Sequence, residues 1–360
     1  MYVPTLSNLV YEHPELGLNF LGFAVGDPCT DDTTQTITGE LNFGLEYAMK
    51  NSFISSETYS YISSHCVKHD PRGMIVPDES SPACKSAWRL YYIATSAGDG
   101  NGPPAKMAHF ISPYNSWGPN NNRWWNMMAT YLAQDDVMKA LHVESYPVRP
   151  WSLFADHLDY TIQYKACFYD SASPDAKPYY DYSMIPFYQK LAGKLRNIIV
   201  FNGDTDPCLQ VRGTEAAVDA MGLKMVEGGD WRPWFFQPDA ASIQVLEDKS
   251  PYWGPFLSYR SMDPQLGGYV KNFEKNLSFV TVHTSGHMVP QYKPVAALHM
   301  FKRGLASMML SPLLNETAIN DASDASFFGS DTEAGYLGEW VRVAQSPAYL
   351  RDAAHAEETH

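Results

Sequence analysis

A histidine between glycine and proline neighbours is the residue in this sequence best suited to acid–base chemistry. His287 lies in the stretch Thr-Ser-Gly-His-Met-Val-Pro at residues 284–290. Apolar and β-branched residues at 277–282 predict a buried strand before it, and residues 294–301 predict a helix with proline in its first turn. A histidine on a loop between a strand and a helix can reach the carboxyl edge of an open sheet, where catalytic groups gather. A lone loop histidine is nevertheless more often an ordinary surface residue.

Two aspartates offer this histidine a partner. Residues 197–201 predict a second buried strand, and the turn Asn-Gly-Asp-Thr-Asp that follows contains Asp204 and Asp206. The acid therefore precedes the histidine in the chain, as it does in α/β-hydrolases, where the order is nucleophile, acid, histidine. Such an acid holds the imidazole in one tautomer and stabilises the imidazolium. The spacing alone equally allows both aspartates to be turn residues.

These stretches resemble the C-terminal signatures of the serine carboxypeptidase family. The signatures are Gly-Asp-Thr-Asp at 203–206 and Ser-Gly-His-Met-Val-Pro at 285–290. Residues 18–28 resemble the family's strand that ends in a Gly-Asn turn, with Asp27 in place of the usual asparagine. Residues 131–142 resemble a helix of the family, which has the same pattern at Tyr131-Leu132, Val137 and Ala140-Leu141-His142. The four motifs occur in family order, so together they are far more specific than any one of them.

The resemblance implies roles for the paired residues. Asp206, the second aspartate of its turn, would orient His287, and Asp204 would cap the turn. His287 would take the proton of a serine nucleophile and later give it to the leaving group. The implied activity is serine-type carboxypeptidase, which removes C-terminal residues from peptides through an acyl-enzyme. An acyltransferase or esterase of the same fold, or a non-catalytic pseudoenzyme or gene-model fragment, are the alternatives.

The nucleophile itself has no clear place in the sequence. No stretch fits Gly-x-Ser-x-Gly, the turn that carries the serine in α/β-hydrolases. Tyr-Val-Pro at 2–4 resembles the end of the family's nucleophile motif, Gly-Glu-Ser-Tyr-Ala-Gly-x-Tyr-Val-Pro, which would place the serine about four residues before Met1. The nearest internal alternative, Ser96, follows a helical pattern and enters a plain loop, whereas the elbow needs a strand, a sharp turn and a helix. We therefore expect this chain to lack the nucleophilic serine.

The predicted fold class is α/β, with an α/β-hydrolase sheet that lacks its N-terminal strands and a mainly helical cap insertion. The hydrolase core would comprise residues 1–45 and 185–308, and the cap would comprise residues 46–184, where helical patterns and long loops prevail. Residues 226–267 read as a further insertion, longer than the family pattern suggests. Residues 309–360 are polar and acidic in part and predict a disordered tail.

The five cysteines suggest disulfides rather than metal binding. None has the C-x-x-C spacing of zinc sites, and we expect no metal and no cofactor. Cys66 and Cys84 flank a loop within the predicted cap and form a plausible local pair. Cys29 and Cys208 each follow a core strand and would form a second disulfide if both loops turn over the same sheet edge. Cys167 remains without a predicted partner within this chain. The resemblance implies that it pairs with a cysteine near the N-terminus of family members, in a segment that would lie outside this chain.

Disulfides and glycosylation sequons together predict secretory routing, to a vacuole or lysosome or to the cell exterior. The sequons begin at Asn276 and Asn315, and Asn276 lies at the start of a core strand, which favours Asn315. A net charge of −14 argues against nucleic acid and anionic membranes as partners. No apolar run approaches the roughly 20 residues of a membrane span. The expected partners are peptide C-termini, and the sequence gives no oligomeric state.

Overall fold

The computed structural model describes the regions in which most of these motifs lie. The described residues are 2–31, 34–35, 40–69, 75–95, 115–116, 123–143, 183–238, 264–314 and 342–343.

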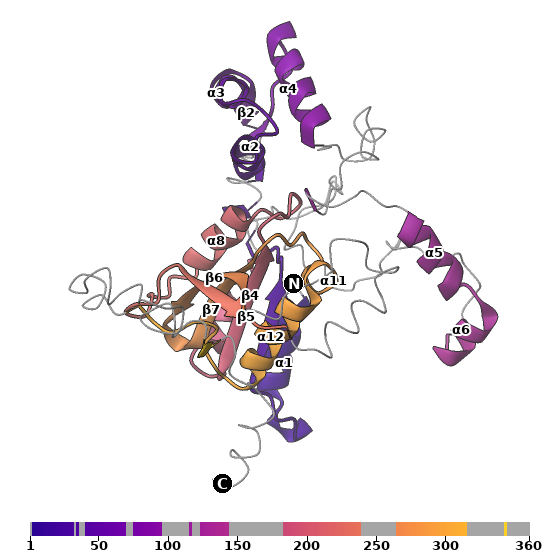
Figure 1. The fold of residues 1–360 in the computed structure, drawn as a ribbon, viewed down its shortest axis with the longest axis vertical. Helices are drawn as coiled ribbons and strands as arrows, with labels where there is room; N and C mark the ends of the chain where they lie inside the picture. Colours follow the sequence, from indigo (N-terminus) through magenta and orange to yellow (C-terminus); the bar gives the residue numbers. More distant parts are fainter. Residues whose placement is uncertain are drawn as a thin grey trace.

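The centre of the molecule is a five-stranded mixed sheet (Figure 1). Its strands are β1 (Gly22–Gly26), β4 (Asn197–Gly203), β5 (Arg232–Phe236), β6 (Gln265–Phe273) and β7 (Leu277–Val282). They lie in the order β1-β4-β7-β6-β5, in which β1, β4 and β7 are parallel and the remaining pairings are antiparallel. The predicted α/β class is confirmed, and β4 and β7 are the two strands predicted before the aspartates and the histidine.

The register brings the carboxyl ends of the three parallel strands to one edge. Gly26 at the end of β1 pairs with Phe201 of β4, and Gly203 at the end of β4 pairs with Val282 of β7. The loops that follow these strands therefore emerge side by side, which is the arrangement in which an open α/β sheet assembles a site.

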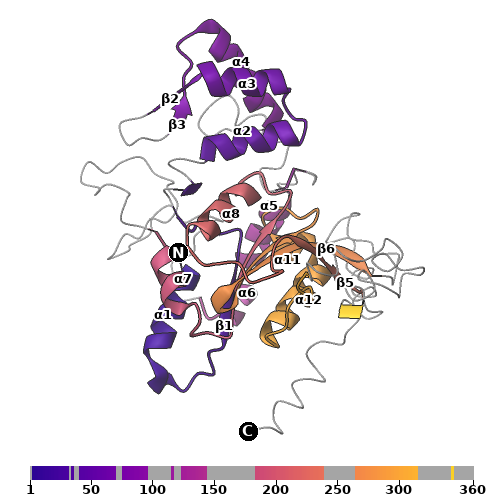
Figure 2. The ribbon, with the colours of Figure 1, turned by 90° about the vertical axis from the view of Figure 1, so that its left-hand side faces the viewer.

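Helices cover both faces of the sheet. Successive side chains of β4 point to opposite faces, so the strand contributes to two cores, one on each side. Ile199 packs into a core shared with α12 (Pro294–Leu305). Val200 packs into a core shared with α7 (Ile185–Leu191) and α8 (Val211–Asp219). Figure 2 shows α12 and α7 on opposite sides of the sheet. A strand buried on both faces reads as a continuous apolar run, which explains why the sequence predicts β4 so clearly.

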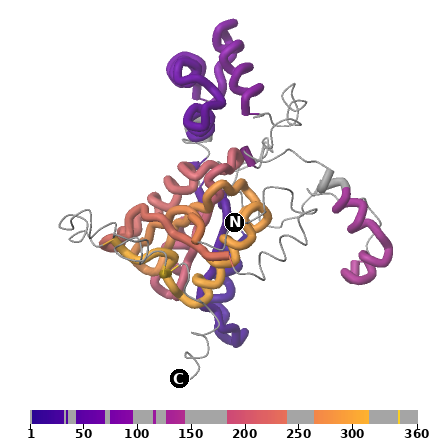
Figure 3. Tube along the Cα trace, in the orientation of Figure 1, coloured from indigo at the N-terminus to yellow at the C-terminus, as the bar shows by residue number. Residues whose placement is uncertain are grey.

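The first helix, α1 (Tyr2–Glu12), lies beside β1 and α7 and is followed by the short helix η1 (Pro14–Leu16). Figure 3 traces the chain from this indigo segment into β1, which contacts the orange α12 although the two are far apart in sequence. Three apolar side chains of α1 point outward: Tyr2, Leu6 and Leu9 are 60%, 62% and 52% exposed. Within the described residues, β1 is also an edge strand. In the described part of the chain, an open sheet edge at β1 therefore lies next to an exposed apolar face of α1.

The described parts of residues 46–184 are mainly helical, as predicted, but the first of these helices begins at Glu40, before the predicted boundary at residue 46. Their elements are α2 (Glu40–Lys50), α3 (Ser56–His65), β2 (Val67–His69), β3 (Ile75–Pro77), α4 (Pro82–Thr95), α5 (Arg123–Leu132) and α6 (Asp135–Ala140). α2, α3 and α4 share a core built on Leu45, Ile62 and Trp88. The predicted disulfide between Cys66 and Cys84 is present beside this core. None of the described helices is long and apolar enough to cross a membrane.

The far edge of the sheet corrects one sequence expectation. The described part of the predicted insertion at 226–267 contains β5, which pairs with β6 and buries alternate residues, including Arg232. The predicted tail begins later than residue 309. Nε of Arg232 donates to the Pro312 carbonyl oxygen at 2.7 Å and Nη2 to the Ser311 carbonyl oxygen at 3.1 Å, and Leu310 is buried. A buried arginine needs several acceptors, and the backbone of 311–312 supplies them. Apart from residues 342–343, the tail from 315 onward lies outside the described residues.

Candidate active site

The loop after β4 turns around the carboxylate of Asp206. Its Oδ1 atom accepts hydrogen bonds from the backbone N–H groups of Cys208 at 2.8 Å and Leu209 at 3.1 Å. An aspartate that bonds to the backbone two residues on defines a tight local turn. The side chain is fully buried, so this turn fixes the carboxylate at the sheet edge.

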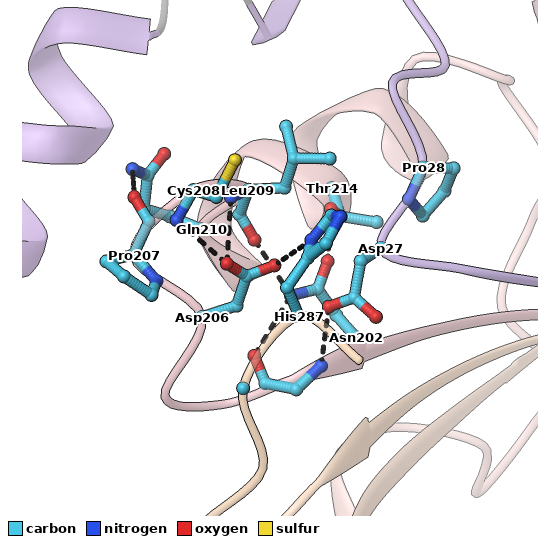
Figure 4. Close-up of polar contacts among 12 residues, drawn as sticks. Asp27, Pro28, Asn202, Asp206, Pro207, Cys208, Leu209, Gln210, Thr214 and His287 are labelled. Atoms are coloured by element: carbon cyan, nitrogen blue, oxygen red, sulfur yellow. Dashed lines mark hydrogen bonds and ion pairs between the residues drawn. The ribbon is translucent and has the colours of Figure 1, made fainter. Parts of the chain in front are cut away.

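His287 reaches the same carboxylate from the loop between β7 and α11 (Val289–Tyr292). Its Nδ1–H donates to Oδ2 of Asp206 at 2.8 Å (Figure 4). This bond selects the tautomer in which Nε2 has no proton and can accept one. The histidine side chain is 29% exposed, so a buried acid holds an imidazole that remains accessible. The structure thus brings together the two residues that the sequence singled out.

A second histidine–aspartate pair uses the other aspartate of the same turn. Nδ1 of His283 lies 2.7 Å from Oδ2 of Asp204. The hydrogen bond to Asp204 raises the pKa of His283. Sequence reasoning gave Asp204 only a turn-capping role and missed His283, although this histidine directly follows the apolar run of β7. The two pairs differ in burial, because both members of this one are partly exposed.

Asp27, at the end of β1, is a third acid at the same edge. Its Oδ1 atom accepts from the backbone N–H of Gly203 at 2.9 Å. Burial raises the pKa of Asp27 well above its usual range, and the negative charge of nearby Asp206 raises it further. Its backbone has φ of 43°, in the left-handed region that aspartate and asparagine tolerate better than most residues.

Residues from the predicted cap contact the acid loop. The backbone N–H of Ser116 donates to the Thr205 carbonyl oxygen at 3.1 Å, and Oγ1 of Thr205 donates to Oδ1 of Asn115 at 2.9 Å. The Tyr47 hydroxyl on α2 lies 2.8 Å from Oγ of Ser116. Burial raises the pKa of Tyr47 to about 12, so the phenol is neutral at physiological pH. No sequence signal pointed to these residues, because a polar contact between distant loops has no periodicity.

The prediction of a disulfide between Cys29 and Cys208 is wrong. Cys29 belongs to a disulfide whose other half lies outside the described residues, and Cys208 retains a thiol. The reason is the direction of the two loops. Asp206 draws the backbone of Cys208 toward itself and His287, whereas Figure 4 shows Pro28, the neighbour of Cys29, on the opposite side of His287. Loops that leave the same sheet edge can still diverge.

One cluster of possible metal ligands occurs among the described residues, and it coincides with the pair. Asp206, Cys208 and His287 each place a ligand atom within 4.8 Å of the others. Asp206 and His287 already bond to each other, and the remaining oxygen of Asp206 accepts two backbone donors. The geometry therefore favours a hydrogen-bonded dyad over a metal centre.

The remaining predicted sites are a glycosylation sequon at Asn276 and three residues outside the described part of the chain. Asn276 is exposed in the turn η6 (Glu274–Asn276) between β6 and β7, which leaves its sequon open to modification. Its Nδ2 donates to the Leu195 carbonyl oxygen at 3.3 Å. Ser96, Cys167 and Asn315 lie outside the described residues.

The comparisons with known proteins extend over most of the chain. The family model described as serine carboxypeptidase matches residues 1–307. Serine carboxypeptidase-like 34 of Arabidopsis thaliana is 25% identical, over 86% of this chain and 58% of its own length. Serine carboxypeptidase-like 27 of the same plant is 27% identical, over 85% of this chain and 58% of its own length. The chain thus spans about 58% of the length of these relatives.

Among solved structures, a prohormone-processing carboxypeptidase from Saccharomyces cerevisiae matches with a TM-score of 0.49 and 17% identity, over 86% of this chain and 60% of that chain.

Proposed function

This chain belongs to the serine carboxypeptidase family, and we propose that Asp206 and His287 are the acid and the histidine of its catalytic triad. The observation that carries this proposal is the 2.8 Å hydrogen bond between His287 Nδ1 and a fully buried Asp206 carboxylate. In that bond the acid fixes the tautomer in which Nε2 carries no proton and can act as a base.

The proposed reaction is removal of a C-terminal residue from a peptide through an acyl-enzyme. A serine hydroxyl would attack the scissile carbonyl carbon and pass its proton to Nε2 of His287. The imidazolium, stabilised by Asp206, would then protonate the leaving amine. Water would hydrolyse the acyl-enzyme with the same histidine as base.

The serine would come from a segment that precedes Met1 in a longer polypeptide. Two features support this: Tyr-Val-Pro at 2–4 resembles the end of the family's nucleophile motif, and these residues begin α1. In an α/β-hydrolase, the nucleophile elbow is a turn that leads directly into a helix.

We further propose peptide C-termini as substrates and secretory routing to a vacuole, a lysosome or the cell exterior. The disulfide between Cys66 and Cys84 supports an oxidising compartment. Transfer of the acyl group to an alcohol instead of water would make the protein an acyltransferase on the same fold.

The test first reads the transcript upstream of the Met1 codon, where the proposal expects an in-frame Gly-Glu-Ser-Tyr-Ala-Gly sequence, and then compares this chain with the longer polypeptide that would include it. A fluorophosphonate probe should label the longer form and not residues 1–360, and blocked dipeptides should lose their C-terminal residue only with the longer form. His287→Ala should abolish both signals.

His283→Ala is the matched control because it removes the neighbouring histidine–aspartate pair. This variant of the longer form should retain both probe labelling and removal of the C-terminal residue. Probe labelling of residues 1–360 that disappears on Ser96→Ala would overturn the assignment of the nucleophile. Equal activity losses in the two histidine variants would overturn the assignment of His287.

A further inference from the structure

A fully buried asparagine holds both ends of the loop that carries Asp206. Asn202 is the last residue but one of β4 and is 0% exposed. Its Nδ2 atom donates to the carbonyl oxygen of Gly203 at 3.0 Å and to that of Leu209 at 2.9 Å (Figure 4). One side-chain amide therefore binds the residue at which the loop begins and a residue close to the start of α8.

A hydroxyl group on α8 fixes the direction of this amide. Oγ1 of Thr214 donates to Oδ1 of Asn202 at 2.6 Å, and Thr214 is also 0% exposed. The reverse orientation of the amide would set its oxygen against two carbonyl oxygens, which donate nothing. Only the observed orientation gives both N–H donors and the oxygen of Asn202 a partner.

The place of Asn202 in the strand makes these bonds necessary. Residues 198–201 of β4 are all apolar, and Val200, which lies on the same face as Asn202, packs into the core shared with α7 and α8. A polar amide buried in such surroundings is costly unless its groups are bonded. An apolar side chain would be enough for packing alone. The amide instead adds directed bonds, and they all lead to the acid loop or to the helix that follows it.

The two carbonyl groups that Asn202 binds are connected directly to Asp206. Leu209 is bonded to Asn202 through its C=O, and its backbone N–H donates to Oδ1 of Asp206 at 3.1 Å. The backbone N–H of Asp206 donates at 3.3 Å to the Gly203 carbonyl oxygen, which also accepts from Asn202. The second carboxylate oxygen, Oδ2, accepts from His287. A continuous set of hydrogen bonds therefore runs from Asn202 through the loop to the histidine.

We propose that Asn202 is a positioning residue for the histidine–aspartate pair. Its amide sets the direction of the Asp206 carboxylate, and the carboxylate in turn sets the direction of the His287 ring. The effect passes through the backbone of Gly203 and Leu209. A loop holds a polar group precisely when side chains locked by packing and hydrogen bonds support it. Asn202, on a central strand, supplies that support, and Thr214 keeps its amide in the working orientation.

Three substitutions separate this role from general stability. Asn202→Leu keeps a branched side chain of similar shape but removes every donor and acceptor of the amide. Thr214→Val removes only the hydroxyl group that orients the amide. Asn272→Leu is the matched control: Asn272 is also buried, and its Nδ2 donates to Oγ of Ser278 at 2.7 Å near the start of β7, at the opposite edge of the sheet from His287. All three variants are made in this chain, residues 1–360, so the test needs no activity.

The proton resonance of the His287 Nδ1–H, assigned with His287→Gln, reports the bond to Asp206. The resonance should be lost or displaced in Asn202→Leu, displaced less in Thr214→Val and unchanged in Asn272→Leu. An unchanged resonance in a folded Asn202→Leu would overturn the proposal. Equal displacement in Asn272→Leu would also overturn it, because the signal would then follow stability alone. If Asn202→Leu does not fold, Thr214→Val decides, and an unchanged resonance there would refute the role.

Amide hydrogen exchange gives an independent measure of the loop. The N–H groups of Cys208 and Leu209 donate to Asp206. Peptides that span residues 204–210 should exchange about tenfold faster in Asn202→Leu than in the wild type, because local opening of the loop no longer breaks the bonds of the amide. Asn272→Leu should not change exchange in this segment selectively. Faster exchange of 204–210 only in proportion to the strands of the sheet would count against the proposal.

The consequence for catalysis rests on the proposed function. In the longer polypeptide, Asn202→Leu should lower kcat by about tenfold and leave KM unchanged, because it misplaces the base without altering contacts to the substrate. Asn272→Leu should change neither constant, and an unchanged kcat in Asn202→Leu would refute the positioning role. An inactive longer polypeptide would contradict the proposed function, whereas the resonance and the exchange of residues 1–360 would still decide the role of Asn202.

Discussion

The backbone of Gly203 packs so closely against Ser285 that a Cβ atom on Gly203 would lie 2.3 Å from the Ser285 carbonyl oxygen. The same carbonyl accepts the Thr205 N–H at 2.9 Å. This contact joins the loop after β4 to the loop after β7, and those loops carry Asp206 and His287. The glycine of the Gly-Asp-Thr-Asp turn is therefore needed for close approach between two backbones.

Gly203→Ala should separate these loops and destabilise the protein by about 1–3 kcal/mol, the range for overpacking. Chemical unfolding measures the change in free energy. Gly213→Ala, in the helix α8, is the matched control. Its new methyl group would lie 3.2 Å from a side-chain atom of Phe43 on α2, and not against backbone. Alanine also favours a helix by about 1 kcal/mol over glycine. Equal stability of Gly203→Ala and the wild type would contradict the close contact.

Asp206→Asn in the longer polypeptide should reduce kcat by about 10⁴-fold, because an amide can hold the imidazole in the wrong tautomer. Asp204→Asn alters the exposed pair with His283 and should change kcat by less than about tenfold. Steady-state kinetics on a blocked dipeptide give both values. Similar losses in the two variants would mean that the sequence-based choice between the aspartates is wrong.

His299 should make the protein sensitive to acid. Burial lowers the pKa of this histidine to about 3, and its ring stacks on Trp234 with centroids 6.1 Å apart. Between the ordinary value of 6.5 and about 3, the unfolded state binds a proton that the folded state does not. Stability should therefore fall as the pH drops below 6.5, by at most about 1.4 kcal/mol per unit.

His299→Phe should reduce this dependence, because phenylalanine can occupy a similar volume without titrating. Thermal unfolding of the two proteins between pH 4 and pH 8 provides the comparison, and the two melting curves should diverge as the pH falls. Parallel pH dependences would show that His299 titrates normally in the folded protein.

Removing the disulfide between Cys66 and Cys84 should destabilise the unit formed by α2, α3 and α4. The bridge closes a separation of 18 residues, for which the chain-entropy model gives about 3 kcal/mol. Calorimetry of the double variant Cys66→Ala, Cys84→Ala should show a lower melting temperature. Cys208→Ser, which removes a thiol outside any disulfide, is the control and should melt as the wild type does.

The sequence by itself determined the parallel centre of the fold and the contact between two of its loops. Strands such as β4 and β7 are buried on both faces, so they read as continuous apolar runs that end in glycine-containing turns. The family resemblance selected Asp206, the second aspartate of its turn, over Asp204 as the partner of His287, and the structure shows that hydrogen bond. The catalytic role of the pair stays a proposal, because the motif describes geometry and not turnover.

Only the tertiary structure decided how the remaining loops run. It placed β5 in the sheet, packed Leu310 into a core, left Cys208 outside any disulfide with Cys29, and brought Asp27 to the same sheet edge as Asp206. None of these relationships has a local sequence period. Periodicity records which face of one element is buried, whereas the direction of a loop depends on contacts with residues far away in the chain. Apolar patterns therefore predict the strands, and packing between their loops determines which polar groups meet.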